Sequence, residues 1–366
     1  MKLTIQLQLL PTSEQATILL DTMARVNQAA TFAAQQGFDN GVFSQPSIHK
    51  LAYRAIRDQF GLSAQLAVRA IGKAVETFQR DKTICPMFRP DGAITYDERN
   101  MGFKGVDKVS LSTLAGRQII GMVYGEYQRE RFDRIKGQCD LVYRDNKFFL
   151  IANVDLPEAP PLEIKAFLGV DLGLINLATT SQGEMFSGET VNRTRRRCAT
   201  ARKQYQRKGT RNAKRRLKKI GKRQSRFQTW RNHNIAKQIV QTAKALGFGI
   251  AMEDLTDIRE RIEDTVGRRT RRRFGNWSFR QLRDFVSYKA RLAGVPVCLV
   301  DPRNTSRICS KCGYCDKANR KTQDRFLCLH CGFSLNADLN AAVNISLIAW
   351  DAFVNHPEKQ QSCVFS

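Results

Sequence analysis

Three acidic residues occupy positions from which a fold could bring their carboxylates together. Asp171 and Glu253 each end a short apolar run, and Asp338 lies in the first turn of a helix that Asn336 is expected to cap. If the two runs are neighbouring strands and the helix packs across their ends, the carboxylates converge. Such a cluster needs a cation, and hard oxygen ligands suit Mg²⁺ or Mn²⁺. Two such ions about 4 Å apart can stabilise both the attacking and the leaving oxygen of a phosphodiester displacement.

Each of these acids also has a simpler interpretation. Asp171 could end a strand in a turn, Glu253 could belong to a loop, and Asp338 could be favoured by the helix dipole. Their coincidence at the ends of three elements favours the nuclease site. Asp254 is the main competitor for the role of Glu253, but side-chain alternation along a strand would point it to the opposite face.

Two Cys-x-x-Cys pairs, separated by 15 residues, have the spacing of a metal site rather than of a disulfide framework. The expected ligands are Cys309, Cys312, Cys328 and Cys331. Four thiolates complete a tetrahedral shell, so we expect one structural Zn²⁺ in a zinc ribbon. The alternative is that Cys315 or His330 replaces one of the four ligands.

A basic tract from Arg193 to Arg231 holds 18 Lys or Arg residues among 39 and no acid. The whole chain of 366 residues has 60 basic and 34 acidic side chains, a net charge of +26, and the tract supplies +18 of it. A solvated helical face is the ordinary interpretation of such a run, but here charge falls on every face. We therefore expect phosphate-backbone binding. The expected contacts are Arg195, Arg196, Arg197, Arg202, Lys203, Arg207, Lys208, Arg211, Lys214, Arg215, Arg216, Lys218, Lys219, Lys222, Arg223 and Arg226.

Other residues near these motifs allow two interpretations each. Tyr205, Phe227 and Trp230 within the tract could stack on bases, although packing is the favoured expectation. Arg320 and Arg325, on the long loop between the cysteine pairs, could be solvated or could reach phosphate. A second basic run between two glycines is expected to form a lid over the acidic site; its arginines are Arg268, Arg269, Arg271, Arg272 and Arg273.

Several classes of function are excluded. The chain has neither a Ser-His-Asp arrangement nor a glycine-rich phosphate loop, which argues against triad hydrolases and nucleotide-driven motors. No apolar run reaches about 18 residues, so no membrane-spanning helix is expected. The first residues lack the features of a signal peptide, and we expect an intracellular protein.

The N-terminal half reads as a small β-domain with helices inserted between its first and second strands. Residues 2–9 alternate as a strand does, and Thr12 with Gln15 can form a capping box. Helical patterns cover 13–36, 47–59 and a stretch after Ser63, and strand patterns return over 84–155 with a hairpin turn at Asp145-Asn146. We expect a β-barrel-like domain from 1–12 and 84–156, a helical domain at 13–83 and a linker at 157–164.

The C-terminal half has the element order of a ribonuclease-H-like domain. Strands are expected at 167–171, 175–180, 184–187, 248–252 and 295–300, and helices over a basic region at 193–246 and at 278–293 and 336–350. This domain would comprise 165–302 and 334–350, with the zinc ribbon inserted at 303–333 and a mobile tail at 351–366. The predicted fold class is α/β plus α+β, in several domains.

These motifs together resemble TnpB, the nuclease encoded by bacterial insertion sequences and a relative of the type V CRISPR effectors. Residues 169–178 (Gly-Val-Asp-Leu-Gly-Leu-Ile-Asn-Leu-Ala) resemble the first RuvC motif of that family, and 250–255 (Ile-Ala-Met-Glu-Asp-Leu) resemble the second. The runs at 232–236, 276–282, 300–306 and 336–345 are similar as well; the last contains Asp338. The resemblance is dense over 167–347 and is one of pattern only in the N-terminal half.

The resemblance implies an RNA-guided DNA endonuclease. A guide RNA (ωRNA or reRNA) would select double-stranded DNA beside a transposon-adjacent motif, and one RuvC site with two Mg²⁺ or Mn²⁺ ions would cut it. Asp171, Glu253 and Asp338 would be the catalytic metal ligands, Arg320 a transition-state or phosphate contact, and the ribbon a target-nucleic-acid-binding element.

The family further implies roles for the remaining domains and for the assembly. The β-domain would be the wedge and the helical insertion the recognition domain, in a monomeric protein bound to RNA in the bacterial cytoplasm and to DNA at the nucleoid, without a membrane partner. Two alternatives stay open: an RNA-guided repressor that binds DNA without cutting it, and a guide-independent transposase or resolvase.

Overall fold

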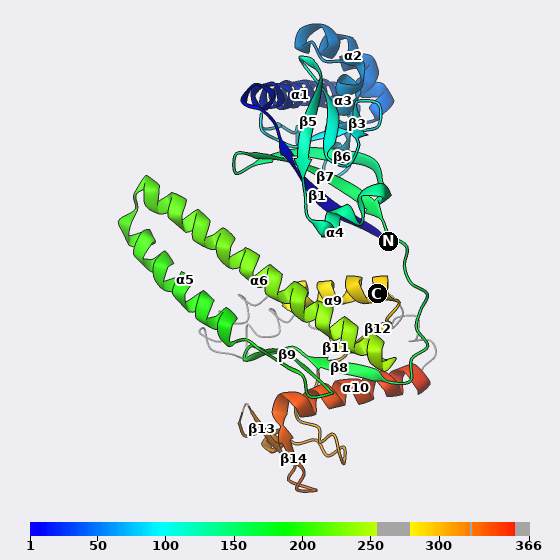
Figure 1. Ribbon diagram of the computed structural model, residues 1–366, viewed down its shortest axis with the longest axis vertical. Coiled ribbons are helices and arrows are strands. Elements are labelled where there is room, and N and C mark those ends of the chain that lie inside the picture. Colours follow the sequence, from blue (N-terminus) through cyan, green and yellow to red (C-terminus); the bar gives the residue numbers. More distant parts are fainter. Residues whose placement is uncertain (255–278, 323, 356–366) are drawn as a thin grey trace. The chain divides into compact units, whose positions relative to one another are not determined.

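The chain folds into two compact units, Met1–Pro157 and Glu158–Ser366 (Figure 1). The computed structural model describes residues 1–254, 279–322 and 324–355. None of the helices in these ranges is long and apolar enough to cross a membrane.

The first unit is built on a nearly closed antiparallel sheet of seven strands, in the order β2-β6-β7-β1-β5-β4-β3. The strands are β1 (Lys2–Leu10), β2 (Ile94–Tyr96), β3 (Met101–Lys104), β4 (Lys108–Thr113), β5 (Gly116–Val123), β6 (Ile135–Arg144) and β7 (Lys147–Asp155). The alternation predicted for β1 is confirmed, because Ile5, Leu7 and Leu9 are buried. Asp145 and Asn146 have φ angles of 53° and 60°, which a tight two-residue hairpin turn requires.

Three helices are inserted between β1 and β2, as the sequence predicts: α1 (Ser13–Asp39), α2 (Gln45–Phe60) and α3 (Ala64–Phe78). The capping box of α1 is present, since Gln15 N–H donates to Thr12 Oγ1 at 3.2 Å and Thr12 N–H donates to Gln15 Oε1 at 3.1 Å. The apolar stripe of α3 is buried along its whole length. A short helix α4 (Glu126–Arg129) and a 3₁₀ turn η1 (Phe132–Arg134) connect β5 to β6.

The second unit has a five-stranded sheet in the order β10-β9-β8-β11-β12. The strands are β8 (Phe167–Asp171), β9 (Asn176–Thr180), β10 (Met185–Ser187), β11 (Gly249–Glu253) and β12 (Val297–Val300), and the helices are α5 (Glu189–Lys208), α6 (Arg211–Leu246), α9 (Phe279–Ala293) and α10 (Ala337–Asn355). Strands β8, β11 and β12 are parallel, and β9 and β10 run antiparallel to their neighbours. This is the ribonuclease-H-like arrangement that the element order predicts.

The two faces of this sheet bury different residues of the same strands. Leu168 and Val170 pack with the apolar residues of α6 and α9. Phe167 and Ala251 instead pack with Ile345 of α10, on the opposite face (Figure 1). Since side chains alternate along a strand, Asp171 in β8 and Glu253 in β11 lie on the α10 face.

A missing side chain lets α10 approach β8 closely. A Cβ on Gly169 would lie 1.9 Å from the Ala342 carbonyl oxygen and 2.7 Å from the Ser346 backbone nitrogen. Ser346 Oγ donates to the Phe167 carbonyl at 2.6 Å and fixes the helix along the strand. Backbone therefore packs on backbone here, which only glycine permits.

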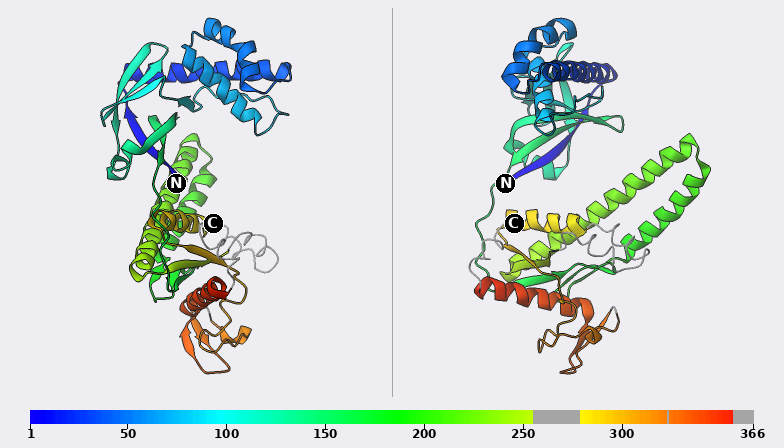
Figure 2. Two further views of the ribbon diagram at one scale, coloured as in Figure 1. Left: turned by 90° about the vertical axis from the view of Figure 1, so that its right-hand side faces the viewer. Right: turned by 180° about the vertical axis from the view of Figure 1, so that it is seen from behind.

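The basic region forms two antiparallel helices rather than one continuous helical segment. Gly209 ends α5 with a φ of 63°, and Thr210 caps α6 by accepting a hydrogen bond from Ala213 N–H at 3.2 Å. The only buried residue of α5 is Val191, and α6 buries Ala213 and then none before Asn232. We call residues 193–231 the basic arm; Figure 2 shows this hairpin extending beyond the sheet.

Between β12 and α10 the chain forms a ribbon of two short strands, β13 (Arg325–Leu327) and β14 (Ser334–Asn336), preceded by a 3₁₀ turn η2 (Lys317–Asn319). As predicted, Asn336 caps α10, because its Oδ1 accepts from the backbone N–H groups of Asp338 at 3.0 Å and Leu339 at 3.2 Å. The helix continues to Asn355, five residues beyond the end expected from the sequence. Its last turns are held by Phe353, whose ring lies 5.6 Å from that of Phe167.

Gly169→Ala should destabilise the second unit by about 1–3 kcal/mol, because the added methyl group overlaps the α10 backbone. Gly221→Ala is the matched control within the same unit: its Cβ would meet nothing closer than Arg202 Nη2 at 3.9 Å. It removes a glycine from the interior of α6 and should stabilise by up to about 1 kcal/mol. Denaturant unfolding of both variants measures the difference. Equal stability of the two would contradict the close packing.

Candidate active site and metal centre

Three carboxylates meet where β8 and β11 end. The pairing of these parallel strands sets Val170 opposite Met252, so Asp171 and Glu253 are the next residues side by side on the same face. Asp338 lies in the first turn of α10, the helix packed on that face. Glu253 is buried, and Asp171 and Asp338 are partly buried.

Burial at this edge raises the pKa of two of the carboxylates, Asp171 and Glu253. Burial, followed by the charges of Glu253 and Asp338, raises the pKa of Asp171 to about 8, and Arg320 only partly offsets this. Burial also raises the pKa of Glu253, while a hydrogen bond from Thr305 and the charge of Arg320 act to lower it. Negative charge at this edge is therefore costly without a cation.

Neighbouring side chains hold each carboxylate in place. Arg320 Nη2 lies 3.1 Å from Asp338 Oδ1, and Asn176 Nδ2 donates to Asp338 Oδ2 at 3.0 Å. Thr305 Oγ1 donates to Glu253 Oε1 at 2.5 Å. The structure thus brings Arg320, from the ribbon, to the acids on which the sequence-based prediction centred.

Asn176 and Thr305 received no role in the sequence analysis, although both lie within motifs that it singled out. Asn176 begins the strand that pairs with β8, and Thr305 follows the carboxyl end of β12, the neighbour of β11. Thr305 lies five residues beyond the end of β12, so no local pattern in the sequence identifies it.

Asp254 does not join the cluster. Its carboxylate forms an ion pair with Arg283 Nη1 at 3.0 Å, on α9, which packs on the other face of the sheet. The alternation expected at the end of β11 is confirmed, and Glu253 is the acid on the α10 face.

This set of donors fits hard divalent cations. All three candidates are carboxylates, they come from three different elements, and their mutual repulsion is the kind that bound Mg²⁺ or Mn²⁺ relieves. Arg320 adds a positive charge at the same edge. Such an arrangement can bind a phosphodiester oxygen through cations on one side and a guanidinium on the other.

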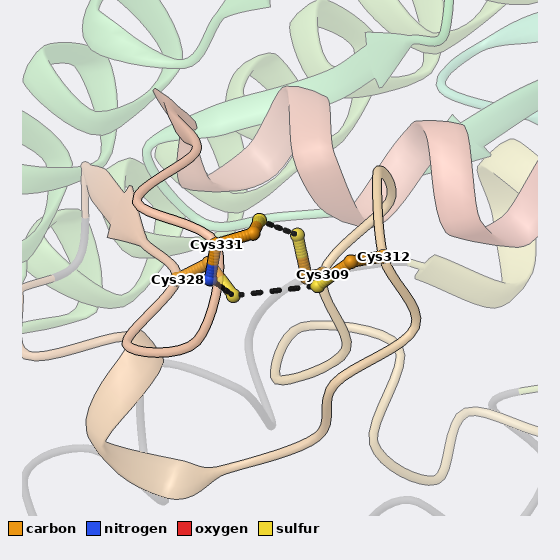
Figure 3. Close-up of side chains that lie close together, drawn as sticks. All are labelled: Cys309, Cys312, Cys328 and Cys331. Carbon is orange, nitrogen blue, oxygen red and sulfur yellow. Dashed lines mark hydrogen bonds between the residues drawn. The ribbon is translucent and has the colours of Figure 1, made fainter.

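Four thiols form a second candidate metal site. The sulfurs of Cys309, Cys312, Cys328 and Cys331 all lie within 4.8 Å of one another (Figure 3). The two pairs face each other, with sulfur–sulfur distances of 3.7 Å and 3.6 Å. Desolvation disfavours ionisation of Cys328, but hydrogen bonds from the backbone N–H groups of Cys331 and His330 act to lower the pKa of this thiol.

The two alternative ligands stay outside this cluster. Cys315 is exposed and forms a β-bridge with Ile308, and neither it nor His330 belongs to the group of converging atoms found among the described residues. The His330 ring stacks on Tyr314 instead, with ring centroids 5.4 Å apart. The spacing argument and the geometry thus select the same four thiols.

The residues expected to contact nucleic acid line the basic arm, and all of them except Arg195, Arg202 and Lys222 are exposed. Phe227 packs against the core of the second unit, whereas Trp230 leaves 57% of its surface exposed. The expected packing therefore holds for Phe227 and in part for Trp230, whose ring centroid lies 6.1 Å from that of Phe227. The lid arginines at 268–273 lie outside the described residues.

Two family models match parts of this chain. Residues 151–258 match OrfB_IS605, described as "Probable transposase", and residues 279–345 match the model described as "Cas12f1-like, TNB domain". Between them they include all three candidate carboxylates and all four thiols. The resemblance to TnpB and its Cas12f relatives is thereby confirmed.

Two relatives and one solved structure illustrate the similarity. The chain is 33% identical over 252 residues to the "CRISPR-associated endodeoxyribonuclease Cas12f1" of Sulfoacidibacillus thermotolerans, a match covering 64% of this chain and 57% of that protein. It is 25% identical over 309 residues to the "Putative RNA-guided DNA endonuclease InsQ" of Escherichia coli K12, covering 79% and 75%. Its fold resembles the "mini-RNA-guided endonuclease CRISPR-Cas_phi3", with a TM-score of 0.54 at 10% identity over 95% of this chain and 92% of that one.

The purified chain should contain about one Zn²⁺, because four thiolates form a closed tetrahedral shell. Cys328→Ser should lose the metal and destabilise the ribbon, whose apolar core consists of few residues. Cys315→Ser is the matched control and should retain it. Elemental analysis after dialysis measures both. Zinc retained in C328S, or lost in C315S, would contradict the ligand assignment.

Without Mg²⁺ or Mn²⁺, the second unit should become less stable as the pH rises from about 5 to about 8. In this window the folded state keeps the proton of Asp171, whose pKa is about 8, while the unfolded state releases it. One group contributes about 1.4 kcal/mol per pH unit. Asp171→Asn should lose this dependence and be the more stable protein at pH 8. Denaturant unfolding of the zinc-loaded protein, in buffer without free divalent cations, tests this, and parallel pH profiles for the two proteins would contradict it.

Proposed function

We propose that this chain, which resembles TnpB and the Cas12f nucleases, is an RNA-guided DNA endonuclease of an insertion sequence. The observation that carries this proposal is the convergence of three carboxylates, from β8, β11 and α10, at one edge of a ribonuclease-H-like sheet. The names of its relatives, an endodeoxyribonuclease and an RNA-guided DNA endonuclease, agree with that chemistry.

In this proposal Asp171, Glu253 and Asp338 hold the catalytic cations. When bound there, two Mg²⁺ or Mn²⁺ ions would activate water and offset the negative charge that develops during phosphodiester hydrolysis. Asn176 orients Asp338, and Arg320 offers its guanidinium to a phosphate oxygen in the same place. Partial burial keeps bulk water away from these charges and strengthens their effect on the substrate.

The basic arm binds the phosphate backbone of RNA or of the guide–target duplex. The helices of the basic arm bury few of the residues within it and expose most of their Lys and Arg side chains. The hairpin therefore presents positive charge and has little apolar surface for another part of the protein to cover. Phosphate contacts bind without reading bases, which suits a protein that leaves sequence selection to a guide. The exposed indole of Trp230 is available to stack on an unpaired base.

Base pairing between guide and target opens the DNA duplex, so no helicase is needed. An RNA–DNA heteroduplex is about as stable as the DNA duplex it replaces, so protein–backbone contacts are enough to favour the exchange. The first unit provides the wedge and the helical recognition domain, which hold the RNA and the guide–target duplex. The proposed complex contains one copy of the protein for each guide RNA.

The ribbon has a structural and a target-binding role. Zn²⁺ bound by the four thiols would fix the two knuckles, and the same segment positions Arg320 beside Asp338. A closed thiolate shell leaves no coordination position for substrate, so the zinc takes no part in cutting.

Asp171→Ala should abolish cleavage of a target matched to the copurified RNA, while binding of that target is retained. Asp254→Asn is the matched control: it changes the neighbour of Glu253, which pairs with Arg283 on the other face, and should leave cleavage near the wild-type level. Sequencing the copurified RNA supplies the guide, and a target library with a randomised flank supplies the adjacent motif. Cleavage is measured in Mg²⁺ and in Mn²⁺.

Each contrary outcome identifies a different function. Undiminished cutting by Asp171→Ala would refute the carboxylate site. Guided binding without any cutting by the wild type would identify a repressor. Cutting or joining of element ends by protein stripped of RNA would identify a guide-independent transposase.

A further inference from the structure

The segment that joins β12 to the first cysteine pair contacts the candidate active site directly. Thr305, in this segment, is 2% exposed, and its hydroxyl lies 2.5 Å from Glu253 Oε1. In the proposed function Glu253 is a metal ligand, so a contact to its carboxylate can affect metal binding.

Thr305 has a single hydroxyl proton and two acceptors within reach. The Pro302 carbonyl lies 3.2 Å from Oγ1, whereas Glu253 Oε1 lies at 2.5 Å. The shorter contact is also the one to a carboxylate, and such charge-assisted bonds are the stronger kind. The proton therefore goes to Oε1, which fixes the rotation of the carboxylate and leaves the other oxygen to face a cation.

Helix α10 holds the Thr305 segment through two asparagines that lie one turn apart. Asn344 Nδ2 donates to the carbonyls of Thr305 at 2.8 Å and of Ile308 at 2.7 Å. Asn340 Nδ2 donates to the Ile308 carbonyl at 2.9 Å, and its Oδ1 accepts from Ser310 N–H at 3.1 Å. Both asparagines are buried, so these bonds are protected from competition by water.

The same helix carries the third carboxylate. Asp338 precedes Asn344 by less than two turns on α10, so a rigid element connects Asp338 to the support of Thr305. The chain of contacts runs from α10 through Asn344 to the Thr305 backbone, and from the Thr305 hydroxyl to Glu253. Glu253 is thus placed by its own strand and, independently, by the helix that bears Asp338.

We propose that Thr305 is a positioning residue. Its hydroxyl holds the Glu253 carboxylate in a fixed position relative to Asp338, because α10 both carries Asp338 and holds the backbone of Thr305. The inference rests on the proposed nuclease function. It follows that removal of the hydroxyl should weaken metal binding at the site more than it affects the fold. Loss of a residue that orients a metal ligand commonly costs about 10–100-fold in metal affinity or activity.

The test compares Thr305→Val, which keeps the shape and loses the hydroxyl, with Thr305→Ser, which keeps the hydroxyl. Ser306→Ala is the control for loss of a neighbouring hydroxyl. Guided DNA cleavage is measured across a Mg²⁺ titration, alongside thermal unfolding and zinc content. We expect T305V to need at least about tenfold more Mg²⁺ for half-maximal cleavage. T305S and S306A should stay close to the wild type, and zinc content should be unchanged in all three.

The outcomes separate this inference from the proposed function. A cleaving wild type with an unchanged Mg²⁺ requirement in T305V would overturn the role of Thr305 alone. An equal loss in T305V and T305S would overturn it too, because the hydroxyl would not be the determinant. A wild-type complex that never cuts would instead refute the nuclease function. Should valine disturb the fold, Thr305→Ala against T305S makes the same comparison.

Discussion

The contact between the backbones of β8 and α10 at Gly169 is the constraint on which the second unit depends. It sets the distance of the helix from the sheet, because any side chain at this position would occupy the space of the Ala342 carbonyl. Asp171 lies two residues further along β8, and Asp338 lies near the start of α10. The close approach at Gly169 therefore determines how far apart Asp171 and Asp338 lie in space, although 166 residues lie between them in the sequence.

This packing brings together groups that repel one another, and the rest of the edge compensates for the repulsion. Arg320 comes from the ribbon, Asn176 from β9 and Thr305 from the segment after β12, so each neighbouring element contributes one contact. Burial, and after it the charges of Glu253 and Asp338, raise the pKa of Asp171, so this compensation is incomplete in the protein alone. We regard the remaining electrostatic cost as the free energy that divalent cations recover when they bind.

The two candidate metal sites are connected through α10. Asn340 and Asn344 bind the segment that leads into Cys309, and the N-terminal end of the helix follows β14 directly. A change in the ribbon would therefore reach the carboxylate edge through hydrogen bonds and short segments rather than through a flexible connection. This arrangement gives the proposed structural zinc an indirect influence on the nuclease site.

Much of this architecture follows from local sequence signals, and the exceptions have identifiable causes. The alternation in β1, the stripe of α3 and the spacing of the cysteines depend on neighbouring residues, so they could be predicted. The break at Gly209 could also have been predicted, because a glycine followed by threonine is a stop and a cap. The extension of α10 to Asn355 and the role of Thr305 depend on tertiary contacts with Phe167 and Glu253, which no local pattern reveals.

The central claim, that three distant acids share one metal-binding edge, can be measured without a guide or a target. Fe²⁺ bound in place of Mg²⁺ generates hydroxyl radicals with ascorbate and peroxide, and these cut the nearest backbone. We expect cuts within a few residues of Asp171, Glu253 and Asp338 together, suppressed by excess Mg²⁺ and absent from Asp171→Asn. Cuts near only one of the three acids, or cuts that persist in that variant, would contradict it.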